Sequence, residues 1–583
     1  MPTTWNSDGS LANVQALINQ AATHDGDTIA LPNGTFTWSS TLTVTKAITI
    51  RGNSTTNWDA PTANQPFCAS PPANSHVDNT IIMYNLTSKL IDFRATTGTL
   101  QRITGVSILP ATQAQSASVF EINGNPSTPL RVDHCYIGDI NVVANIIWNN
   151  AYNYGVFDHN VSICEHGVIQ NGPGRFNGDQ GDSAWEEAVG FGGPKFFFIE
   201  NNFIKHGGDI VWGGKTCARF NHVHGETSLH GTQIVGAVFV CHGTGRQGSG
   251  RGGRAYEVYG NDFHWNTDGK SMDGSDTGTA YWYNNTFTNN NLRTTGIAIA
   301  EFRMGYDWGN PYYSCSGYPT RLWDLMDTEG NGTNVPGHST FVYYSGTTGA
   351  GTNTGTIVDS GNPGWATGRW IGYVARRSSG LWGNGIESTT ANTVGVKGIG
   401  FDNGWASGQA YEIVRPIYLL DQPGLGWGDH INRSSPTWLH QDSHREPLYS
   451  YNNVNVDTSG PSAGQHQNYN PEPCMSKILV QNRDYFNDTQ LPGYTPYQYP
   501  HPLTQQNQEM ITLTGTAATT ETITLTWTGA LGTTVDIYRD AALFAGAVPN
   551  SGTYTTTETG SGIGVSHVWE VRGNTASNDV TLV

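Results

Sequence analysis

One short pattern recurs between residues 130 and 290, and it constrains the fold more than any other feature of the chain. It consists of an apolar residue, a polar pair that ends in Asn, any residue, and a second apolar residue. The copies are FIENNFI around Asn202, CARFNHV around Asn221, EVYGNDF around Asn261 and WYNNTF around Asn285, with FDHNVSI around Asn160 as a looser copy and VDHCYI placing His134 at the same point. From residue 134 the steps are 26, 42, 19, 40 and 24 residues, so the long steps indicate an insertion or a degenerate copy.

This period predicts a solenoid. Repeats of roughly 20–25 residues with short strand-like segments and Gly/Asn turns are typical of stacked coils. We therefore expect an all-β fold, a parallel β-helix with two or three short strands per coil and a ladder of stacked Asn side chains at one corner. Because side chains alternate along a strand, Asn221 and Val223 should point into the coil, and His222 and His224 should point outward.

The start of the chain fits the first coil of such a fold. Residues 10–21 (SLANVQALINQA) place apolar side chains at helical spacing, and Ser10 is in position to cap the helix. Residues 26–53 then alternate apolar and polar side chains between turn signals, as strands do. We expect the helix to cover the open edge of the first coil.

These features carry a resemblance to a known family. The opening, the Asn pattern, SLHGT (228–232) and ILVQNRDYFNDTQLPGYTPYQYPHPL (478–503) are similar to the pectate-lyase-like, right-handed parallel β-helix proteins of bacteria and phage particles. The likeness covers roughly residues 10–503. It implies a right-handed β-helix, and the likeness to phage spikes implies a homotrimer. It selects no activity, because the superfamily includes lyases, hydrolases, adhesins and tailspikes, and no motif matches a pectate-lyase catalytic set.

Changes in composition divide the rest of the chain. LYSYNNVNV (448–456) resembles a returning rung, and the Pro- and Tyr-rich PGYTPYQYPHPL (492–503) reads as an extended strap. The last 75 or so residues alternate like strands and resemble a fibronectin type III-like or immunoglobulin-like sandwich, with Trp527 and Tyr538 at core positions. We assign residues 1–351 to the helix cap and β-helix, 352–416 to a small β insertion, 417–503 to the returning rung and strap, and 504–583 to the sandwich.

Charge and composition exclude several function classes. The 29 basic and 47 acidic residues give a net charge of −18, which repels phosphate backbones and argues against a nucleic-acid partner. No run of eighteen apolar residues is present, so we expect no membrane insertion. The opening MPTTWNSDGS lacks the basic and apolar regions of a secretory signal. The seven cysteines show no C-x-x-C spacing, and most are expected to be buried apolar side chains.

The histidines of ARFNHVHGETSLHGTQ (218–233) are the first candidate site. An H-x-H pair on one face can bind zinc, but no second ligand pair follows, so we expect no metal there. We instead expect His222 and His224 to contact substrate on an exposed face. His230, in the family-like SLHGT, is a candidate catalytic residue or a turn histidine that bonds to backbone carbonyls.

Carboxylates provide the second set of candidates. Glu301 and Arg303 share a face of an expected strand and form either a catalytic pair or a surface ion pair. Asp307 follows them as a candidate for substrate binding. A loop inserted between rungs contains acidic side chains that could bind Ca²⁺ or form a solvated acidic loop, namely Asp179, Asp182 and Glu186.

Aromatic side chains provide the third set of candidates. Among 18 tryptophans, Trp212 and Trp308 are expected in loops next to rungs and are the best candidates to stack on sugar rings. We therefore expect a virion-surface or extracellular protein that binds polysaccharide or cell-surface glycan and contacts virion proteins or copies of itself. Two alternatives stay open: a polysaccharide lyase or glycoside hydrolase that acts in the β-helix groove, and a purely structural virion rod.

Overall fold

The computed structural model describes most of the chain. The residues that it describes are 2–59, 74–111, 118–125, 127–140, 146–150, 154–164, 167–171, 188–206, 211–225, 241–242, 253–265, 272–275, 278–288, 297–299, 342–371, 373–377, 383–396, 404–414, 446–456, 468–471, 479–505, 514–519, 522–526, 534–539, 542–549, 551, 553–557, 569–573 and 579–582. They divide into two compact units, Met1–Tyr497 and Gln498–Val583.

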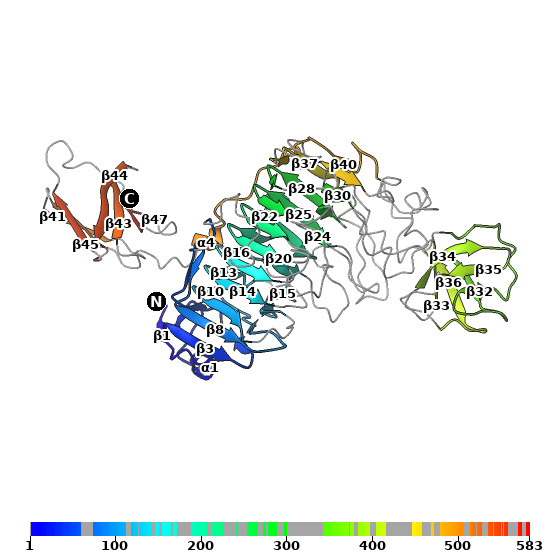
Figure 1. The fold of residues 1–583 in the computed structure, drawn as a ribbon, viewed down its shortest axis with the longest axis horizontal. Helices are drawn as coiled ribbons and strands as arrows, with labels where there is room; N and C mark the ends of the chain where they lie inside the picture. Colours follow the sequence, from blue (N-terminus) through cyan, green and yellow to red (C-terminus); the bar gives the residue numbers. More distant parts are fainter. Residues whose placement is uncertain are drawn as a thin grey trace. The chain divides into compact units, whose positions relative to one another are not determined.

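The first unit is a parallel β-helix with three strand-bearing faces, which confirms the predicted fold class (Figure 1). Sheet 1 contains β1 (Thr4–Asn6), β2 (Thr28–Ala30), β5 (Thr49–Arg51), β10 (Gln101–Thr104), β13 (Leu130–Asp133), β16 (Gly155–Asp158), β19 (Phe197–Glu200), β22 (Lys215–Arg219), β25 (Ala255–Tyr259), β28 (Thr279–Tyr283), β37 (Leu448–Tyr451) and β40 (Tyr485–Phe486). Sheet 2 contains β3 (Gly34–Trp38), β8 (Thr80–Tyr84), β11 (Ser107–Pro110), β14 (Tyr136–Ile140), β17 (Val161–Cys164), β20 (Phe203–His206), β23 (His222–Gly225), β26 (Asp262–Trp265), β29 (Thr286–Thr288) and β38 (Val454–Asn455).

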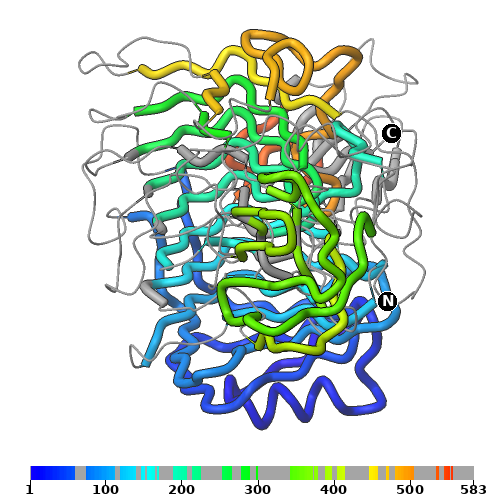
Figure 2. Tube along the Cα trace, turned by 90° about the vertical axis from the view of Figure 1, so that its right-hand side faces the viewer, coloured from blue at the N-terminus to red at the C-terminus, as the bar shows by residue number. Residues whose placement is uncertain are grey.

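The third face contains two groups of parallel strands. Sheet 3 contains β4 (Leu42–Val44), β9 (Ile91–Phe93), β12 (Phe120–Ile122), β15 (Ile147–Asn149), β18 (Ile169–Asn171), β21 (Val211–Trp212) and β24 (Cys241–His242). A three-stranded sheet follows with β27 (Met272–Ser275), β30 (Ile297–Ile299) and β39 (Tyr469–Pro471). Each coil therefore adds one strand to each face, and Figure 2 shows the coils stacked in the order of the sequence.

The predicted capping helix is present at the first coil. Helix α1 (Leu11–Asn19) begins after Ser10, whose Oγ accepts a hydrogen bond of 3.3 Å from the backbone N–H of Asn13. Val14 and Ile18 are buried in the β-helix core. A side-chain cap satisfies one of the free amides at the helix start, and the apolar stripe covers the end of the coil stack.

The predicted asparagine ladder is the main polar feature of the interior. Each side-chain amide donates to the side-chain oxygen of the Asn in the next coil, over distances of 2.8–3.1 Å, through Asn160, Asn202, Asn221, Asn261, Asn285 and Asn453. The residue before each member has a positive φ: His159, Asn201, Phe220, Gly260, Asn284 and Asn452. The ladder therefore sits directly after a left-handed corner that turns the chain from sheet 1 to sheet 2.

One assignment in the sequence pattern was wrong by a single residue. The backbone N–H of Cys135, not a group of His134, donates to Asn160 Oδ1 at 2.9 Å. His134 has a φ of 50° and takes the corner position instead. The step of 42 residues between Asn160 and Asn202 is an insertion and not a missing copy, because β16 pairs directly with β19.

A closing segment runs back along the outer face of sheet 1. The N–H of Thr489 donates to the carbonyl of Ser450, and Tyr494 Oη donates to Glu257 Oε2 at 2.5 Å. Further along, the carbonyl of Tyr497 accepts a hydrogen bond of 2.8 Å from Arg219. The closing segment therefore crosses β37, β25 and β22 in reverse order, and its residues 492–497, which belong to the predicted strap, make the contacts with β25 and β22.

A six-stranded antiparallel sheet forms the inserted domain. Its order is β31 (Val342–Thr347), β36 (Ala410–Val414), β33 (Val374–Arg377), β34 (Gly383–Thr389), β35 (Thr393–Val396) and β32 (Thr356–Val358). The bridge between Thr348 and Asp359 joins the two ends, so the sheet closes on itself. The first strand begins at Val342, ten residues before the boundary that composition indicated. Trp370, Trp405 and Tyr411 are buried in its separate core.

The second unit contains the short helix α4 (Pro502–Gln505) and two antiparallel sheets. One sheet has β41 (Thr514–Thr519), β42 (Thr522–Thr526) and β45 (Thr553–Thr557), and the other has β44 (Ala542–Pro549), β43 (Thr534–Arg539), β46 (Trp569–Gly573) and β47 (Asp579–Leu582). Val535 and Ile537 are buried. Trp527 and the side chain of Tyr538 lie outside the described residues.

Candidate functional site

A cluster of histidine and aspartate side chains lies on the outer face of sheet 2. Strand β23 presents His222 and His224 there, because Val223 between them is buried in the coil interior. In the next coil β26 places Asp262 opposite His222 and His264 opposite His224. The parallel register thus turns two short motifs, H-x-H and D-x-H, into a square of four polar side chains.

Asp262 joins the square through hydrogen bonds. Its Oδ2 accepts from His264 Nε2 at 2.8 Å and faces His222 Nδ1 at 3.4 Å, while Thr286 Oγ1 donates to Oδ1 at 3.1 Å. Burial alone would raise the pKa of Asp262, but the hydrogen bonds from the two imidazoles outweigh it and hold the pKa well below its usual value. Asp262 is therefore a carboxylate at any physiological pH and fixes the orientation of both rings.

His224 supports the cluster from the side. Its ring stacks on His264 with centroids 4.6 Å apart and lies 4.8 Å from the ring of Phe203. Burial, together with the nearby His264, lowers the pKa of His224 to about 3, so the ring is neutral. We expected an exposed substrate contact here. The side chain does leave the coil on its outer side, but neighbouring coils cover it and only 5% of the residue is exposed.

An arm from the start of the chain reaches this cluster. We define the arm as residues 53–59 and 74–80, which carry the antiparallel pair β6 (Thr55–Thr56) and β7 (His76–Val77). Trp58 lies 5.7 Å from the His222 ring and 5.9 Å from the His159 ring. It also packs on the apolar patch of Val161 and Phe203.

Polar contacts anchor both parts of the arm. Asp59 Oδ1 lies 3.4 Å from His222 Nε2. Thr56 Oγ1 donates to the carbonyl of His159 at 2.6 Å, and in the second part His76 stacks on Tyr136 at 3.6 Å. The indole and the carboxylate of the arm therefore border the histidine cluster, with Asp59 largely exposed to solvent.

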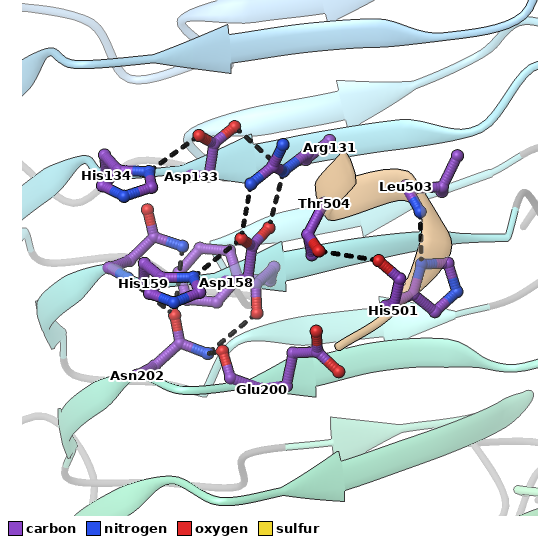
Figure 3. Close-up of polar contacts among 12 residues, drawn as sticks. Arg131, Asp133, His134, Asp158, His159, Glu200, Asn202, His501, Leu503 and Thr504 are labelled. Atoms are coloured by element: carbon purple, nitrogen blue, oxygen red, sulfur yellow. Dashed lines mark hydrogen bonds and ion pairs between the residues drawn. The ribbon is translucent and has the colours of Figure 1, made fainter. Parts of the chain in front are cut away.

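A second set of histidines occupies the left-handed corner between sheet 1 and sheet 2 (Figure 3). His134 and His159 stack with centroids 5.1 Å apart, and each Nδ1 bonds to the preceding aspartate, at 2.8 Å to Asp133 and 2.9 Å to Asp158. Arg131 donates to both oxygens of Asp158, from Nε and from one terminal nitrogen. These aspartates are fully buried, so the ionic framework fixes where the His159 ring meets Trp58.

On sheet 1 the carboxylates of this ionic framework are paired with arginine side chains. Burial would raise the pKa of Asp133, but Arg102 and Arg131 hold it well below its usual value. One coil further, Arg219 Nε donates to Glu200 Oε2 at 2.7 Å. A buried charge that is paired and hydrogen-bonded is a structural element. Asp133, Arg131, Glu200 and Arg219 are buried, and the Arg102 side chain is 12% exposed. We therefore assign them a positioning role.

The remaining predicted site residues are not brought together with the cluster. Trp212 is in β21, where it pairs with Gln170, and its side chain is outside the described part of the chain. The catalytic candidates Glu301, Arg303 and His230 lie outside the described residues. The same holds for the substrate-binding candidates Asp307 and Trp308 and for the acidic loop with Asp179, Asp182 and Glu186. Of the predicted set, the described structure joins only His222 and His224.

Two functional positions were missed although the sequence held the signal. Asp262 and His264 have the same offsets from Asn261 as His222 and His224 have from Asn221, so the ladder register predicts their contact. Trp58 had no such signal, because 163 residues separate Asp59 from His222 and the arm belongs to no repeat.

The cluster contains hydrogen-bonding groups and an aromatic ring. Among the described residues, no group of three or more His, Cys, Asp or Glu side chains is arranged to hold a metal ion. The cysteines at positions 135, 164 and 217 are buried, as expected. The cluster combines a fixed carboxylate, an imidazole with both nitrogens near carboxylates, and an indole. Such a set can hydrogen-bond hydroxyl groups and stack on an apolar ring face.

Comparison with known proteins adds no relative. No family model, no curated protein and no solved structure matches this chain. No helix in the described ranges has the length and apolar character needed to cross a membrane.

Proposed function

We propose that the protein binds polysaccharide through the outer face of sheet 2, as a β-helix component of a virion surface or of the extracellular space. The supporting observation is the half-exposed group of Trp58, His222 and Asp262, which combines an indole with hydrogen-bonding groups of fixed orientation. Sugar rings present C–H faces to indoles and hydroxyls to carboxylates and imidazoles. The long stack of coils offers successive positions along one chain of sugars.

The likeness to pectate-lyase-like phage and bacterial proteins supports this assignment on the level of fold. The parallel coils agree with the β-helix that the resemblance implied, and the Asn ladder and the helix at the first coil are features on which the resemblance rests. In the second unit, strands 1, 2 and 5 form one sheet and strands 3, 4, 6 and 7 the other, an order that fits a fibronectin type III-like sandwich. We propose that this sandwich is an accessory module and that the β-helix assembles as a homotrimer, alone or with virion proteins.

A glycoside hydrolase is the second candidate. Asp59 and Asp262 lie on opposite sides of one imidazole ring, which keeps them within the roughly 5–10 Å over which paired carboxylates act on a glycosidic bond. His222 fills the space between them, however, where a sugar and a water molecule would have to fit. A binding role therefore agrees better with the packing than hydrolysis does. A lyase would have to use Glu301, Arg303 or His230, which lie outside the described residues.

The proposal is tested with a panel of immobilised bacterial polysaccharides. We expect the wild-type chain to bind at least one of them, and Trp58→Ala to weaken binding about tenfold or more, as loss of an aromatic anchor does. Trp148→Ala is the matched control, because Trp148 is a half-exposed tryptophan on sheet 3. Equal binding by both variants would refute this surface. Release of reducing ends or of unsaturated sugars from the same panel would favour an enzyme, and no binding to any member would favour a structural rod.

A further inference from the structure

His222 stands between two carboxylates that come from distant parts of the chain. Its Nδ1 lies 3.4 Å from Asp262 Oδ2 on β26, and its Nε2 lies 3.4 Å from Asp59 Oδ1 on the arm. A neutral imidazole carries one N–H and one lone pair, so it can donate to only one of these oxygens. The other contact would then set a lone pair against a carboxylate. Only the imidazolium form donates on both sides.

In the neutral form of His222, Asp262 and Asp59 compete for the single N–H of the ring, and Asp262 keeps it. Asp262 belongs to the rigid coil and is held by His264 and Thr286. Asp59 lies on the arm, and 74% of its side chain is exposed. When His222 loses its proton, the remaining N–H therefore stays with Asp262, and the contact that is lost is the one to the arm.

We propose that protonation of His222 docks the arm, so that the surface formed by Trp58, His222 and Asp262 is assembled as the pH falls. The effect on ligand binding rests on the proposed function, whereas the docking of the arm does not. In this scheme the imidazolium bridges coil and arm, and Trp58 is held against His159 and His222. At higher pH the arm keeps its apolar contacts but loses its ionic one.

The charged groups around His222 favour this behaviour. The carboxylates of Asp262 and Asp59 face it from β26 and from the arm, while His224 and His264 pack beside it and Lys205 lies opposite His224 on β20. Burial alone would lower the pKa of His222, but the two aspartates outweigh it, and the pKa lies above its ordinary value. The ring of His222 therefore keeps its proton to higher pH than a free imidazole does.

The other histidine that anchors the arm takes up its proton at lower pH than His222. Burial lowers the pKa of His76, which stacks on Tyr136, although Asp78 lies 3.7 Å away. Asp78 accepts from Ser107 at 2.5 Å, and Thr56 donates to a backbone carbonyl. Beneath Trp58, the His159 ring is bonded to Asp158, whose carboxylate is paired with Arg131. The acid-dependent part of the docking is thus located at His222.

Amide hydrogen exchange of residues 53–59, followed at several pH values between about 5 and 8 and corrected for the intrinsic rate, tests the docking. We expect protection to rise about three- to fivefold toward low pH, as a partly exposed ion pair gives. Asp59→Asn, which changes a mostly exposed group, and His222→Gln should remove this dependence. His24→Gln, an exposed histidine elsewhere on the chain, should retain it.

The outcomes separate the two proposals. An unchanged pH dependence in Asp59→Asn, or none in the wild type, overturns the docking mechanism. If the arm responds as expected and a bound polysaccharide is held more tightly at low pH only when Asp59 is present, the whole inference stands. An arm that responds while affinity does not vary with pH refutes the link to binding. A responding arm with no polysaccharide bound at all leaves the docking intact and refutes the proposed function.

Discussion

Replacement of Asn261 by alanine should destabilise the β-helix more than any surface change. The side-chain oxygen of Asn261 accepts from the backbone N–H and the side-chain amide of Asn221, at 3.0 and 2.9 Å. Its own amide donates to the carbonyls of Ala218 and Tyr259 and to Asn285 Oδ1, at 3.0–3.2 Å. Asn261 is 1% exposed, so no water replaces these partners without entering the core.

The magnitude follows from the groups that lose a partner. The backbone N–H of Asn221 is left unsatisfied in the interior, which costs about 1–3 kcal/mol. The side-chain amide of Asn221 keeps its bonds to the carbonyls of Ile199 and Arg219, so it and the carbonyl of Ala218 each lose one hydrogen bond, worth about 1 kcal/mol. Together with the cavity, we expect a loss of about 4–6 kcal/mol in the free energy of unfolding, a value that few single substitutions reach. Urea denaturation followed by tryptophan fluorescence measures it, with the transition of the β-helix analysed separately from those of the other domains.

The matched control is Asn284→Gly. Asn284 is the neighbouring corner residue, is exposed, and has a φ of 54°, which glycine adopts without strain. It loses one exposed hydrogen bond with Asn452, so we expect a change below about 1 kcal/mol. If Asn261→Ala costs no more than this control, the ladder does not stabilise the coil stack and the reasoning fails.

Two buried titratable groups give pH effects of opposite sign. Burial raises the pKa of Glu257 from 4.5 to about 6 despite the hydrogen bond from Tyr494. The folded state therefore holds this proton more tightly than the unfolded state, and the free energy of unfolding falls by about 2 kcal/mol as the pH rises from 4.5 to about 6. Glu257→Gln should remove this decrease, and an unchanged slope between variant and wild type in urea titrations would contradict it. His224 has a pKa of about 3 in the folded state instead of 6.5, so as the pH falls the unfolded chain takes up this proton first. The contribution of His224 to the free energy of unfolding is therefore complete above pH 6.5, and about 4–5 kcal/mol of it are lost as the pH falls toward 3. His224→Gln should flatten this acid limb, and a variant that unfolds with the wild-type acid midpoint would show that the ring is not buried neutral.

The fold was predictable because its main determinant is periodic. The Asn position recurs in the coils from Asn160 to Asn453, and a parallel strand must place its neighbours at equal offsets, so one local pattern fixes the register of sheets 1 and 2 there. The prediction erred where the pattern is degenerate. His134 seemed to replace Asn because it follows the aspartate as His159 does, but the hydrogen-bonding position belongs to Cys135, which uses its backbone.

The candidate site was predictable only within the repeat. The outward direction of His222 follows from strand alternation, but the burial of His224 depends on the aromatic ring of Phe203 and on His264 in neighbouring coils. The contribution of Trp58 depends on a non-repeating arm. The period of the sequence predicts which face of the coil a side chain points to, but it does not predict which residues cover that face.

The coil stack resumes after a long insertion in the chain. The ladder steps from Asn285 to Asn453 with an amide contact of 2.8 Å, although 168 residues separate them in the chain. The returning chain is fixed before its strand begins, because Arg254 donates through both terminal nitrogens to the two oxygens of Glu446, at 2.5 and 2.9 Å. Arg254 is fully buried, so this pair ties the start of β37 to the start of β25, across the intervening strand β28.

Glu446→Gln should therefore loosen the last coils and leave the first ones intact. Removal of the carboxylate charge from a buried guanidinium costs about 3–5 kcal/mol, and the loss is local because each coil contacts only its neighbours. We expect faster amide exchange in β37 and β38 and unchanged exchange in β13 and β16, with Glu121→Gln, at the part-exposed pair with Lys89, as the control. Uniform loss of protection along the whole β-helix would show that the coils unfold as one unit and that the ion pair does not act locally.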